Sequence, residues 1–236
     1  MQLSIVVPFY SESKNVPLVL NGFKEFQSKY DFELICVDNG SKDDTAQVLA
    51  GALQSGQYPF LKIVTVPVNI GYGWGIMSGI RSAQGEVLAW THGDMQTPVA
   101  DVFKAYEVYK SKTQNLKSKI IVKGWRRNRN LQQIILSFGM AVIASVILRR
   151  KLTEINAQPK LFPKQLLSLL SDAPKDFSLD LYLLCIAQNN GYKIVTIDVR
   201  FPDRLHGVSS WAFSWKSKWK TVWRSMKYIW AIRNVV

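Results

Sequence analysis

A histidine, an aspartate and a glutamine stand close together in the stretch HGDMQ, as His92, Asp94 and Gln96, directly after the apolar run EVLAW. Two more polar clusters, YSE at 10–12 and DNGSKDD at 38–44, also follow apolar runs. Acidic side chains at such positions suit a divalent cation that carries a phosphorylated ligand, because Mg²⁺ keeps few protein ligands and shares phosphate oxygens. A neutral imidazole can also ligate Mn²⁺. The clusters therefore predict a metal-dependent phosphate site.

Two common phosphate-binding loops are missing from the sequence. No G-x-x-x-x-G-K-[ST] pattern occurs, and NIGYGWGIMSG carries Ile76 where G-x-G-x-x-G requires its third glycine. The sequence therefore argues against P-loop and dinucleotide-binding functions.

The elements that must position these clusters alternate along the first half of the chain. Apolar runs predict strands in LSIVV, FELICVD, FLKIVTV and EVLAW, and helices are expected at Val16–Phe26, Thr45–Leu53 and Gly75–Ala83. Alternation of this kind predicts an α/β fold with a mainly parallel sheet flanked by helices. Ligands bind outside the carboxyl ends of parallel strands, so the three polar clusters should meet at one edge of the sheet.

The second half continues the pattern with less regularity. A helix is expected at Val99–Tyr109, followed by a short strand in KIIV, a basic loop in GWRRNRN and a late strand in YKIVTIDVRF. The 236 residues suffice for one sizeable core but not for two full domains.

The net charge indicates which kind of partner to expect, and the cysteines indicate the cellular compartment. The formal net charge of +13 implies a polyanionic partner, such as nucleic acid, anionic lipid or phosphates. Cys36 and Cys185 stand in apolar surroundings and are expected to be buried free thiols, which suits a reducing cytoplasm. Met1–Tyr10 resembles a strand, and no secretory signal is visible there.

Two segments indicate a membrane surface. Ile134–Leu148 contains no charge and is too short for a comfortable span of about 20 residues. Two interpretations stay open for this segment: a helix buried in the protein, or a helix at 131–148 that dips into the membrane interface. Basic residues precede and follow this segment, at 126–129 and 149–151.

The second segment, within 208–236, contains four tryptophans that recur every four residues: Trp211, Trp215, Trp219 and Trp223. At roughly 100° per residue, Val222, Met226, Ile229 and Trp230 fall on the same arc, and lysines and arginines cluster beside it. The pattern predicts an amphipathic helix in a membrane interface. Packing on the protein's own core is the alternative. Base stacking fits the regular spacing less well, so no nucleic acid partner is expected.

The ordered motifs of the chain resemble those of family 2 glycosyltransferases. SIVVPFYSESKN, ELICVDNGSKDDT, NIGYGWGIMSGIRSAQGEVLAWTHGDMQTP and RLHGVSS carry the resemblance, which runs from about Ser4 to Ser210. Within the family, the chain is most similar to the polyprenyl-phosphate branch. The resemblance implies a GT-A (Rossmann-like) fold, at 1–207, and a nucleotide-diphosphate sugar, linked to UDP or GDP, as donor. It also implies a divalent cation, Mg²⁺ or Mn²⁺.

The resemblance assigns roles to residues on the donor and metal motifs. Pro8, Tyr10 and Glu12 fall on the first nucleotide-binding motif, and Asp38 falls on the base-contacting aspartate, followed by Asn39 where a second acid is usual. HGD falls on the D-x-D metal motif, so Asp94 is the strongest ligand candidate. His92 stays open as a ligand, a phosphate hydrogen-bond donor or a spectator.

The resemblance also assigns residues to the acceptor. Arg126 and Arg129 fall on arginines near the acceptor phosphate, Lys160 is a candidate phosphate contact, and Arg204 begins the R-x-x-G-x-S loop. Asp180 falls on an acidic residue at a helix start and is the candidate base for a hydroxyl acceptor.

These observations predict a glycosyltransferase that moves a sugar from a nucleotide donor to a membrane acceptor, expected to be polyprenyl phosphate. We expect it at the cytoplasmic face of a membrane, bound to the anionic surface as a peripheral or monotopic protein. Transfer to a glycan or lipid hydroxyl is one alternative. A degenerate sugar-nucleotide-binding or scaffolding subunit is another, because His92 and Asn39 both replace acidic residues.

Overall fold

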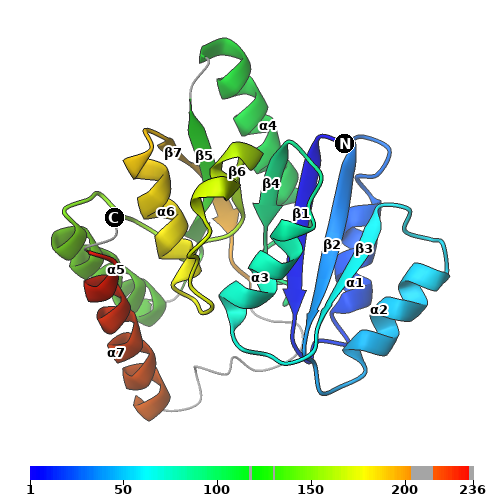
Figure 1. Ribbon diagram of the computed structural model, residues 1–236, viewed down its shortest axis with the longest axis horizontal. Coiled ribbons are helices and arrows are strands. Elements are labelled where there is room, and N and C mark those ends of the chain that lie inside the picture. Colours follow the sequence, from blue (N-terminus) through cyan, green and yellow to red (C-terminus); the bar gives the residue numbers. More distant parts are fainter. Residues whose placement is uncertain (117–118, 130, 203–214, 234–236) are drawn as a thin grey trace.

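The computed structural model describes residues 1–116, 119–129, 131–202 and 215–233 (Figure 1). The elements in chain order are β1 (Leu3–Phe9), α1 (Val16–Lys24), β2 (Phe32–Asn39), α2 (Thr45–Gln54), β3 (Leu61–Val66), α3 (Tyr72–Arg81), β4 (Val87–Trp90), α4 (Val99–Leu116), β5 (Ile120–Arg127), α5 (Leu131–Leu148), β6 (Lys160–Pro163), the 3₁₀ helix η1 (Lys164–Leu169), α6 (Leu179–Asn189), β7 (Lys193–Arg200) and α7 (Trp215–Ile232).

One sheet carries the fold. Its 7 strands follow the order β3-β2-β1-β4-β6-β5-β7. The β1–β2, β2–β3, β1–β4 and β5–β7 pairs are parallel, whereas β6 is antiparallel to both of its neighbours. The expected mainly parallel sheet flanked by helices is confirmed.

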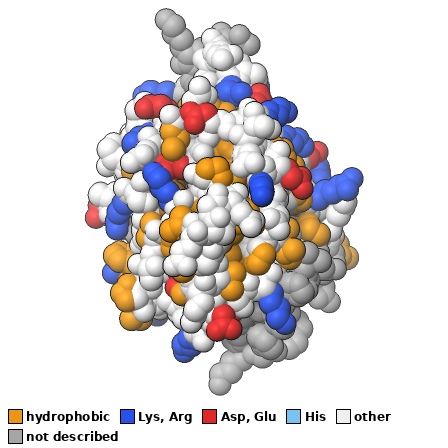
Figure 2. All heavy atoms as spheres, turned by 90° about the vertical axis from the view of Figure 1, so that its right-hand side faces the viewer, with side chains coloured by type: hydrophobic (Ala, Val, Ile, Leu, Met, Phe, Trp, Pro, Cys, Tyr) orange, Lys and Arg blue, Asp and Glu red, His pale blue; other side chains and the backbone are white. Residues whose placement is uncertain are grey.

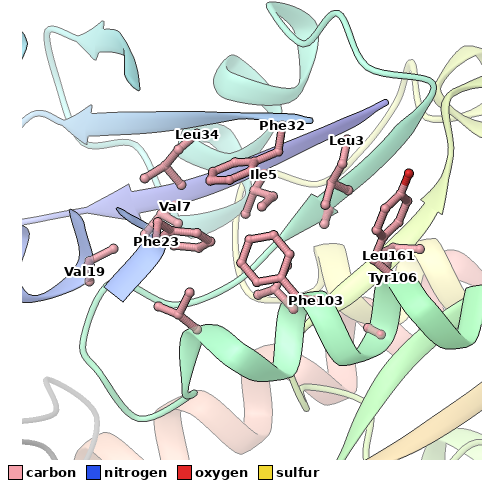
Figure 3. Close-up of a cluster of buried hydrophobic side chains, with 14 of the residues drawn as sticks. Leu3, Ile5, Val7, Val19, Phe23, Phe32, Leu34, Phe103, Tyr106 and Leu161 are labelled. Atoms are coloured by element: carbon pink, nitrogen blue, oxygen red, sulfur yellow. The ribbon is translucent and has the colours of Figure 1, made fainter. Parts of the chain in front are cut away.

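Hydrophobic cores cover both faces of the sheet, which explains why the central strands are continuous apolar runs. On one face, α1, α2 and α4 pack against alternate strand residues such as Leu3, Ile5 and Val7 (Figure 3). Phe103 of α4 anchors this side, with its ring 5.9 Å from that of Phe23 and 5.3 Å from that of Phe32. On the other face, α3, α5, α6 and α7 pack against the intervening strand residues and the buried Trp90.

The first strand extends past the apolar run LSIVV, which ends before Pro8. β1 continues through Pro8 to Phe9, because Pro8 pairs in register with Val37 of β2 on one side only. The β1–β4 pairing runs from Leu3 to Val6, so Pro8 lies beyond the ladder on its other side and its missing N–H leaves no gap there.

The half of the sheet formed by β6, β5 and β7 differs from the sequence prediction in two ways. The first part of the expected basic loop, Gly124–Arg127, belongs to β5, because the parallel pairing with β7 continues to Arg127. β6 has only 4 residues, too few for alternation to show in the sequence. It nevertheless joins β4 to β5 and so connects the two halves of the sheet.

Candidate active site

The loops that follow β1 and β2 are tied together at the carboxyl edge of the sheet. The Ser11 amide donates to Ser41 Oγ (3.0 Å), and the Glu12 amide donates to Thr45 Oγ1 (2.9 Å). Asp43 accepts from the Ser13 amide (3.1 Å). Burial acts to raise the pKa of Asp43, but bonds from Thr45 and Ser13 outweigh it and lower that pKa to about 2. The carboxylate therefore stays ionised and holds both loops.

The structure brings together the residues expected to bind the nucleotide. Asp38 is buried at the end of β2 and accepts from the Ser41 amide through Oδ1 (3.0 Å). The neighbouring Asn39 donates to the Gly71 carbonyl (3.1 Å), while its own buried Oδ1 has no hydrogen-bond partner among the described residues. Pro8 lies beside them on β1, and Tyr10 is 43% exposed, so its ring is accessible to a ligand.

HGDMQ forms a tight turn after β4. Gly93 lies against the Phe9 ring, which a Cβ at this position would approach within 2.7 Å, so only glycine fits. Met95 adopts a left-handed conformation with φ 61°. The turn buries Asp94, whose Oδ1 accepts from the Gln96 amide (3.1 Å). Gln96 Nε2 in turn donates to the Pro202 carbonyl (3.3 Å).

The imidazole of His92 lies beside the ring of Tyr72, and the two ring centroids are 5.8 Å apart. Burial lowers the pKa of His92, although Asp94 and Asp180 oppose this effect. The imidazole is therefore neutral near pH 7, the form that ligates metal ions.

Asp94 and His92 fit a cation only together with ligand oxygens. Among the residues that the structure describes, no group of three or more His, Cys, Asp and Glu side chains could hold a metal ion. One carboxylate and one imidazole leave several coordination positions for diphosphate oxygens and water, and the imidazole suits Mn²⁺ better than Mg²⁺.

Asp180 is held firmly at the start of α6. Its Oδ1 accepts from Trp90 Nε1 (3.2 Å) and Gln158 Nε2 (3.0 Å) and pairs with Lys160 Nζ (3.2 Å). Donors of the protein itself thus already occupy this carboxylate oxygen. These contacts favour a structural role for Asp180 over the role of base.

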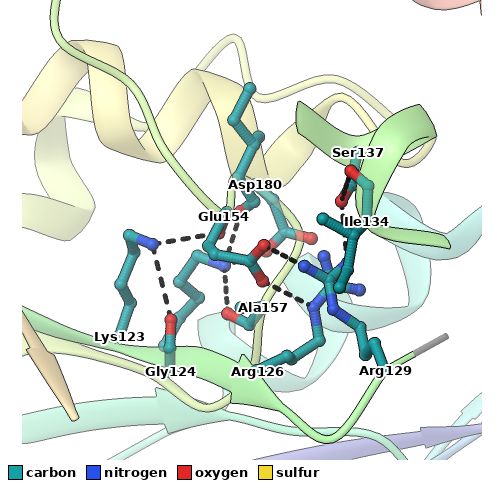
Figure 4. Close-up of polar contacts among 11 residues, drawn as sticks. Lys123, Gly124, Arg126, Arg129, Ile134, Ser137, Glu154, Ala157 and Asp180 are labelled. Atoms are coloured by element: carbon teal, nitrogen blue, oxygen red, sulfur yellow. Dashed lines mark hydrogen bonds and ion pairs between the residues drawn. The ribbon is translucent and has the colours of Figure 1, made fainter. Parts of the chain in front are cut away.

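Glu154 holds the two arginines expected at the acceptor (Figure 4). Its carboxylate pairs with Arg126 Nε (2.8 Å) through one oxygen and with Arg129 Nη2 through the other. Arg129 also donates to Ser137 Oγ of α5 (2.7 Å). Burial acts to raise the pKa of Glu154, but the two guanidinium groups outweigh it and keep this pKa below its ordinary value.

Lys160, expected as a phosphate contact, is fully buried in this structure. Besides Asp180, its ammonium contacts the carbonyls of Ile155 (2.8 Å) and Ala157 (2.6 Å). A phosphate at Lys160 would have to displace one of these partners. Lys160 therefore fixes the chain between α5 and β6 that carries Glu154.

The two polar clusters adjoin each other. The Tyr72 hydroxyl accepts from Gln158 Nε2 (3.1 Å), which also binds Asp180, and the Tyr72 ring faces His92. We call the loops at 10–15, 38–45 and 91–96, where the nucleotide donor is expected, the donor side of the site. The acceptor side, named after the acceptor expected there, consists of the charged residues Lys123, Arg126, Arg129, Glu154, Lys160 and Asp180.

Sequence reasoning missed several of these groups. Glu154 and Gln158 carry no local pattern, and Lys123 shows only as a charge after the apolar run KIIV. Arg204 and Trp211 lie outside the described residues.

An exposed apolar face extends from the acceptor side along α5. The side chains on it are 37–71% exposed, and they are Leu131, Ile134, Ile135, Phe138, Val142, Ile143 and Val146. α7 packs beside α5 (Figure 1). Ile229 and Ile232 of α7 are buried, whereas Trp223 and Trp230 are exposed. The residues expected to lie on one apolar arc therefore divide: Ile229 packs on the core, while the side chains of Trp223 and Trp230 remain at the surface. Within the described residues, no helix is long and apolar enough to cross a membrane.

Comparison with known proteins gives a family match. The model of the family described as Glycosyl transferase family 2 matches residues 4–164. The dolichyl-phosphate beta-glucosyltransferase ALG5A of Trichomonas vaginalis is 26% identical over 212 residues, which cover 84% of this chain and 65% of that protein. The human dolichyl-phosphate beta-glucosyltransferase is 36% identical over 110 residues, covering 44% of this chain and 34% of that protein.

A bacterial relative is similar over a comparable part. The undecaprenyl-phosphate 4-deoxy-4-formamido-L-arabinose transferase of Pseudomonas fluorescens is 33% identical over 104 residues, covering 42% of this chain and 30% of that protein. The matches thus span 30% to 65% of the length of these relatives, less than two thirds in each case.

Solved structures show the same fold. Glucosyl-3-phosphoglycerate synthase from Mycobacterium tuberculosis, in complex with Mn²⁺, UDP-glucose and phosphoglyceric acid, has a TM-score of 0.75 to this chain. The sequences are 16% identical, and the match covers 100% of this chain and 80% of that one. The expected GT-A arrangement of the sheet is thereby confirmed.

Proposed function

The chain belongs to glycosyl transferase family 2, and on that premise we propose that it moves a sugar from a nucleotide-diphosphate sugar to a polyprenyl phosphate. The curated relatives named above carry dolichyl-phosphate or undecaprenyl-phosphate acceptors in their names, which supports this acceptor class.

The observation that carries the proposal is the pair of guanidinium groups beside the strand ends. Arg126 and Arg129 meet at Glu154, within a cluster that also contains two buried lysines. Arginine suits a phosphate because its planar fork can donate two parallel hydrogen bonds. A phosphate acceptor is already ionised and needs no strong base, which agrees with the engaged state of Asp180.

The donor side would hold the nucleotide diphosphate. In this proposal Asp38, Asn39 and Tyr10 contact the nucleoside, and Asp94 with His92 would hold a divalent cation next to its phosphates. Such a cation, when bound, neutralises the charge that develops on the leaving diphosphate. Asp94 itself stays in place through its bond to the Gln96 amide.

The apolar face of α5 and the exposed tryptophans of α7 favour a membrane as the place where the acceptor is met. Tryptophan at the level of the lipid headgroups and cations beside it are typical of interfacial helices. The face over β3 and α2 differs, because hydrophobic side chains there are interspersed with charges of both signs (Figure 2). Since both cysteines are free and buried, we place the protein at the cytoplasmic face of that membrane.

The test is a transfer assay with radiolabelled UDP- and GDP-sugars, Mn²⁺ or Mg²⁺, and two acceptors: polyprenyl phosphate and the matching free polyprenol. We expect labelled lipid from the phosphate only. Equal product from the alcohol would instead support a hydroxyl acceptor. Nucleotide-sugar binding without transfer to either acceptor would support a scaffolding subunit.

A further inference from the structure

Two lysines face each other inside the acceptor side. Lys123 of β5 and Lys160 of β6 are direct cross-strand partners, and their side chains are 1% and 0% exposed. Like charges in this position repel each other, so the pair requires a reason. Lys160 has the carboxylate of Asp180 as a counter-ion.

Lys123 lacks such a counter-ion among the described residues. Its ammonium donates to the carbonyls of Glu154 (3.0 Å) and Gly124 (3.4 Å), and no described carboxylate forms an ion pair with it. The charged groups that act on it come from every neighbouring element: Arg126 from its own strand, Lys160 from β6, Glu154 from the preceding loop and Asp180 from α6.

The acceptor side therefore contains more positive than negative charge. Four basic side chains, Lys123, Lys160, Arg126 and Arg129, stand against two carboxylates, Glu154 and Asp180. Full ionisation leaves an excess of two positive charges in a largely buried cluster. Burial lowers the pKa of Lys123 to about 7, helped by Lys160 and Arg126 and opposed by Glu154 and Asp180. The cluster therefore gains or loses a proton at Lys123 near neutral pH.

We propose that Lys123 adjusts the charge of the acceptor site: it takes up a proton when a phosphate monoester binds beside Arg126 and Arg129, and loses it after transfer. This proposal rests on the proposed function. An anion next to the guanidinium groups favours the charged form of a nearby lysine, and a protonated lysine strengthens anion binding in return.

The reaction changes the charge that Lys123 meets. The bond from the sugar to the nucleotide diphosphate breaks, a bond from the sugar to an acceptor phosphate oxygen forms, and the diphosphate leaves with the bonding electrons. A monoester of charge about −1.5 to −2 near pH 7 becomes a diester of charge −1. The proton on Lys123 then returns to solvent. Lys123 thus favours binding of the substrate over the product.

The experiment measures binding of a short isoprenyl phosphate and the matching isoprenyl sulfate to the full chain by calorimetry in detergent, from pH 6 to 8.5. The sulfate has no ionisation of its own in this range. Lys123 protonation favours the anion, so sulfate affinity should be highest below the lysine pKa and fall as pH rises through it. A displacement of one pKa unit on binding corresponds to a loss of about tenfold in affinity.

Lys123→Met removes the titrating group, and Lys119→Met removes an exposed lysine just before the same strand as a matched control. We expect a flat sulfate profile for Lys123→Met and the parental profile for the control. The preference for isoprenyl phosphate over its methyl diester at pH 7 should also fall several-fold in Lys123→Met.

A pH-independent sulfate affinity in the parent protein would overturn the proposal without any variant, so misfolding of Lys123→Met cannot mask the result. A parental pH profile in folded Lys123→Met would overturn it as well. Failure of both probes to bind would instead contradict the acceptor assigned under the proposed function.

Discussion

The donor side and the acceptor side adjoin each other but are built from different interactions. On the donor side, backbone amides donate to neutral or carboxylate side chains across short loops, as Ser11 does to Ser41 and Glu12 to Thr45. On the acceptor side, buried charges are held by other buried charges, as Arg126 and Arg129 are by Glu154. The hydrogen bonds of the donor side fix the backbone of its loops. In the acceptor side, the electrostatic energy of each buried charge depends on all the other charges of the cluster.

This difference predicts different responses to substitution. A donor-side change should remove a function and leave the fold, because each loop is held by several independent bonds. An acceptor-side change should cost stability or alter charge, because removal of one ion leaves its partner uncompensated. The four predictions that follow test this contrast, beginning with the largest effect.

Asp94→Asn should lower turnover by at least about 10³-fold, close to the upper end for loss of one electrostatic contact in a catalytic site. The amide keeps the bond from the Gln96 amide but loses the charge that would hold a cation. The free energy of unfolding should change by less than about 1 kcal/mol. Sugar-transfer rates and urea unfolding check the two parts.

His92→Ala is the companion variant and should lower turnover less than Asp94→Asn does. Nucleotide binding with Mn²⁺ that equals the parent in Asp94→Asn would show that the cation is held elsewhere. A large loss of stability in Asp94→Asn would remove the contrast between the two sides.

Glu154→Ala should lower the free energy of unfolding by about 3 kcal/mol, the lower end of the range for breaking a buried pair. Two guanidinium groups would lose their shared carboxylate, and Arg129 is only 6% exposed. Glu107→Ala is the control, because Glu107 pairs with Lys110 at the surface and is 50% exposed. Urea unfolding at pH 7 measures both.

The ion pairs of Glu154 with Arg126 and Arg129 also make its contribution to stability dependent on pH. Because the arginines keep the pKa of Glu154 below its ordinary value, the stabilisation is present above the unfolded pKa of about 4.3 and lost as pH falls through the folded value. The difference in the free energy of unfolding between the parent and Glu154→Ala should therefore become smaller at acid pH. A constant difference from pH 7 to pH 3 would show that Glu154 acts through packing.

The contrast also explains which parts the sequence could predict. β1, β2 and β4 are buried apolar runs that end in polar clusters, so these strands and the position of Asp38, Asn39 and Asp94 at one edge of the sheet follow from local pattern. Glu154 and Arg126 lie 28 residues apart, and no periodicity links them. Their pairing depends on the short strand β6, which is too brief to recognise before the fold is known.

The tryptophan helix shows the same limit. Its amphipathic pattern predicted a helix in a membrane interface. The structure has a helix at Trp215–Ile232, and its place in an interface stays a prediction. The pattern could not separate a face that packs on α5 from one that stays exposed, because both are apolar. Ile229 lies on the first face and Trp230 on the second.

Arg126→Lys should slow transfer by about 30-fold, or about 2 kcal/mol, within the range for a hydrogen bond to a charged group. Lysine keeps the charge but loses the planar fork that binds phosphate oxygens in parallel. Affinity for the nucleotide should stay unchanged, since Arg126 lies on the acceptor side. Initial rates at varied acceptor concentration, with separate nucleotide titrations, measure the two properties.

Arg127→Lys is the matched control, because Arg127 is the next residue and pairs with Asp198 at the surface, where it is 56% exposed. Its transfer rate should equal that of the parent. Equal losses in both variants would mean that the general positive charge of this strand matters and not the position of one guanidinium.

The smallest effect is expected at the apolar surface beside the acceptor side. Trp223→Glu and Trp230→Glu should each weaken binding to anionic vesicles by roughly 1 kcal/mol, about fivefold, since each side chain is already partly covered by protein and contributes only its exposed part. Phe138→Glu on α5 should act similarly, because this ring is 67% exposed on the adjoining helix. Leu53→Glu on α2 introduces the same charge at a side chain that is 48% exposed on the other side of the sheet, and it should leave binding unchanged.

Co-sedimentation with vesicles of anionic and of neutral lipid separates the apolar contribution to membrane binding from the electrostatic one. Cations near an anionic surface add about 1 kcal/mol each, so all proteins should bind neutral vesicles more weakly, while the ranking of the variants should persist. Equal weakening by Leu53→Glu would assign the effect to net charge. Parental binding by all three variants on α5 and α7 would mean that this face does not meet the bilayer, and the acceptor would then have to reach Arg126 and Arg129 without help from the surface next to them.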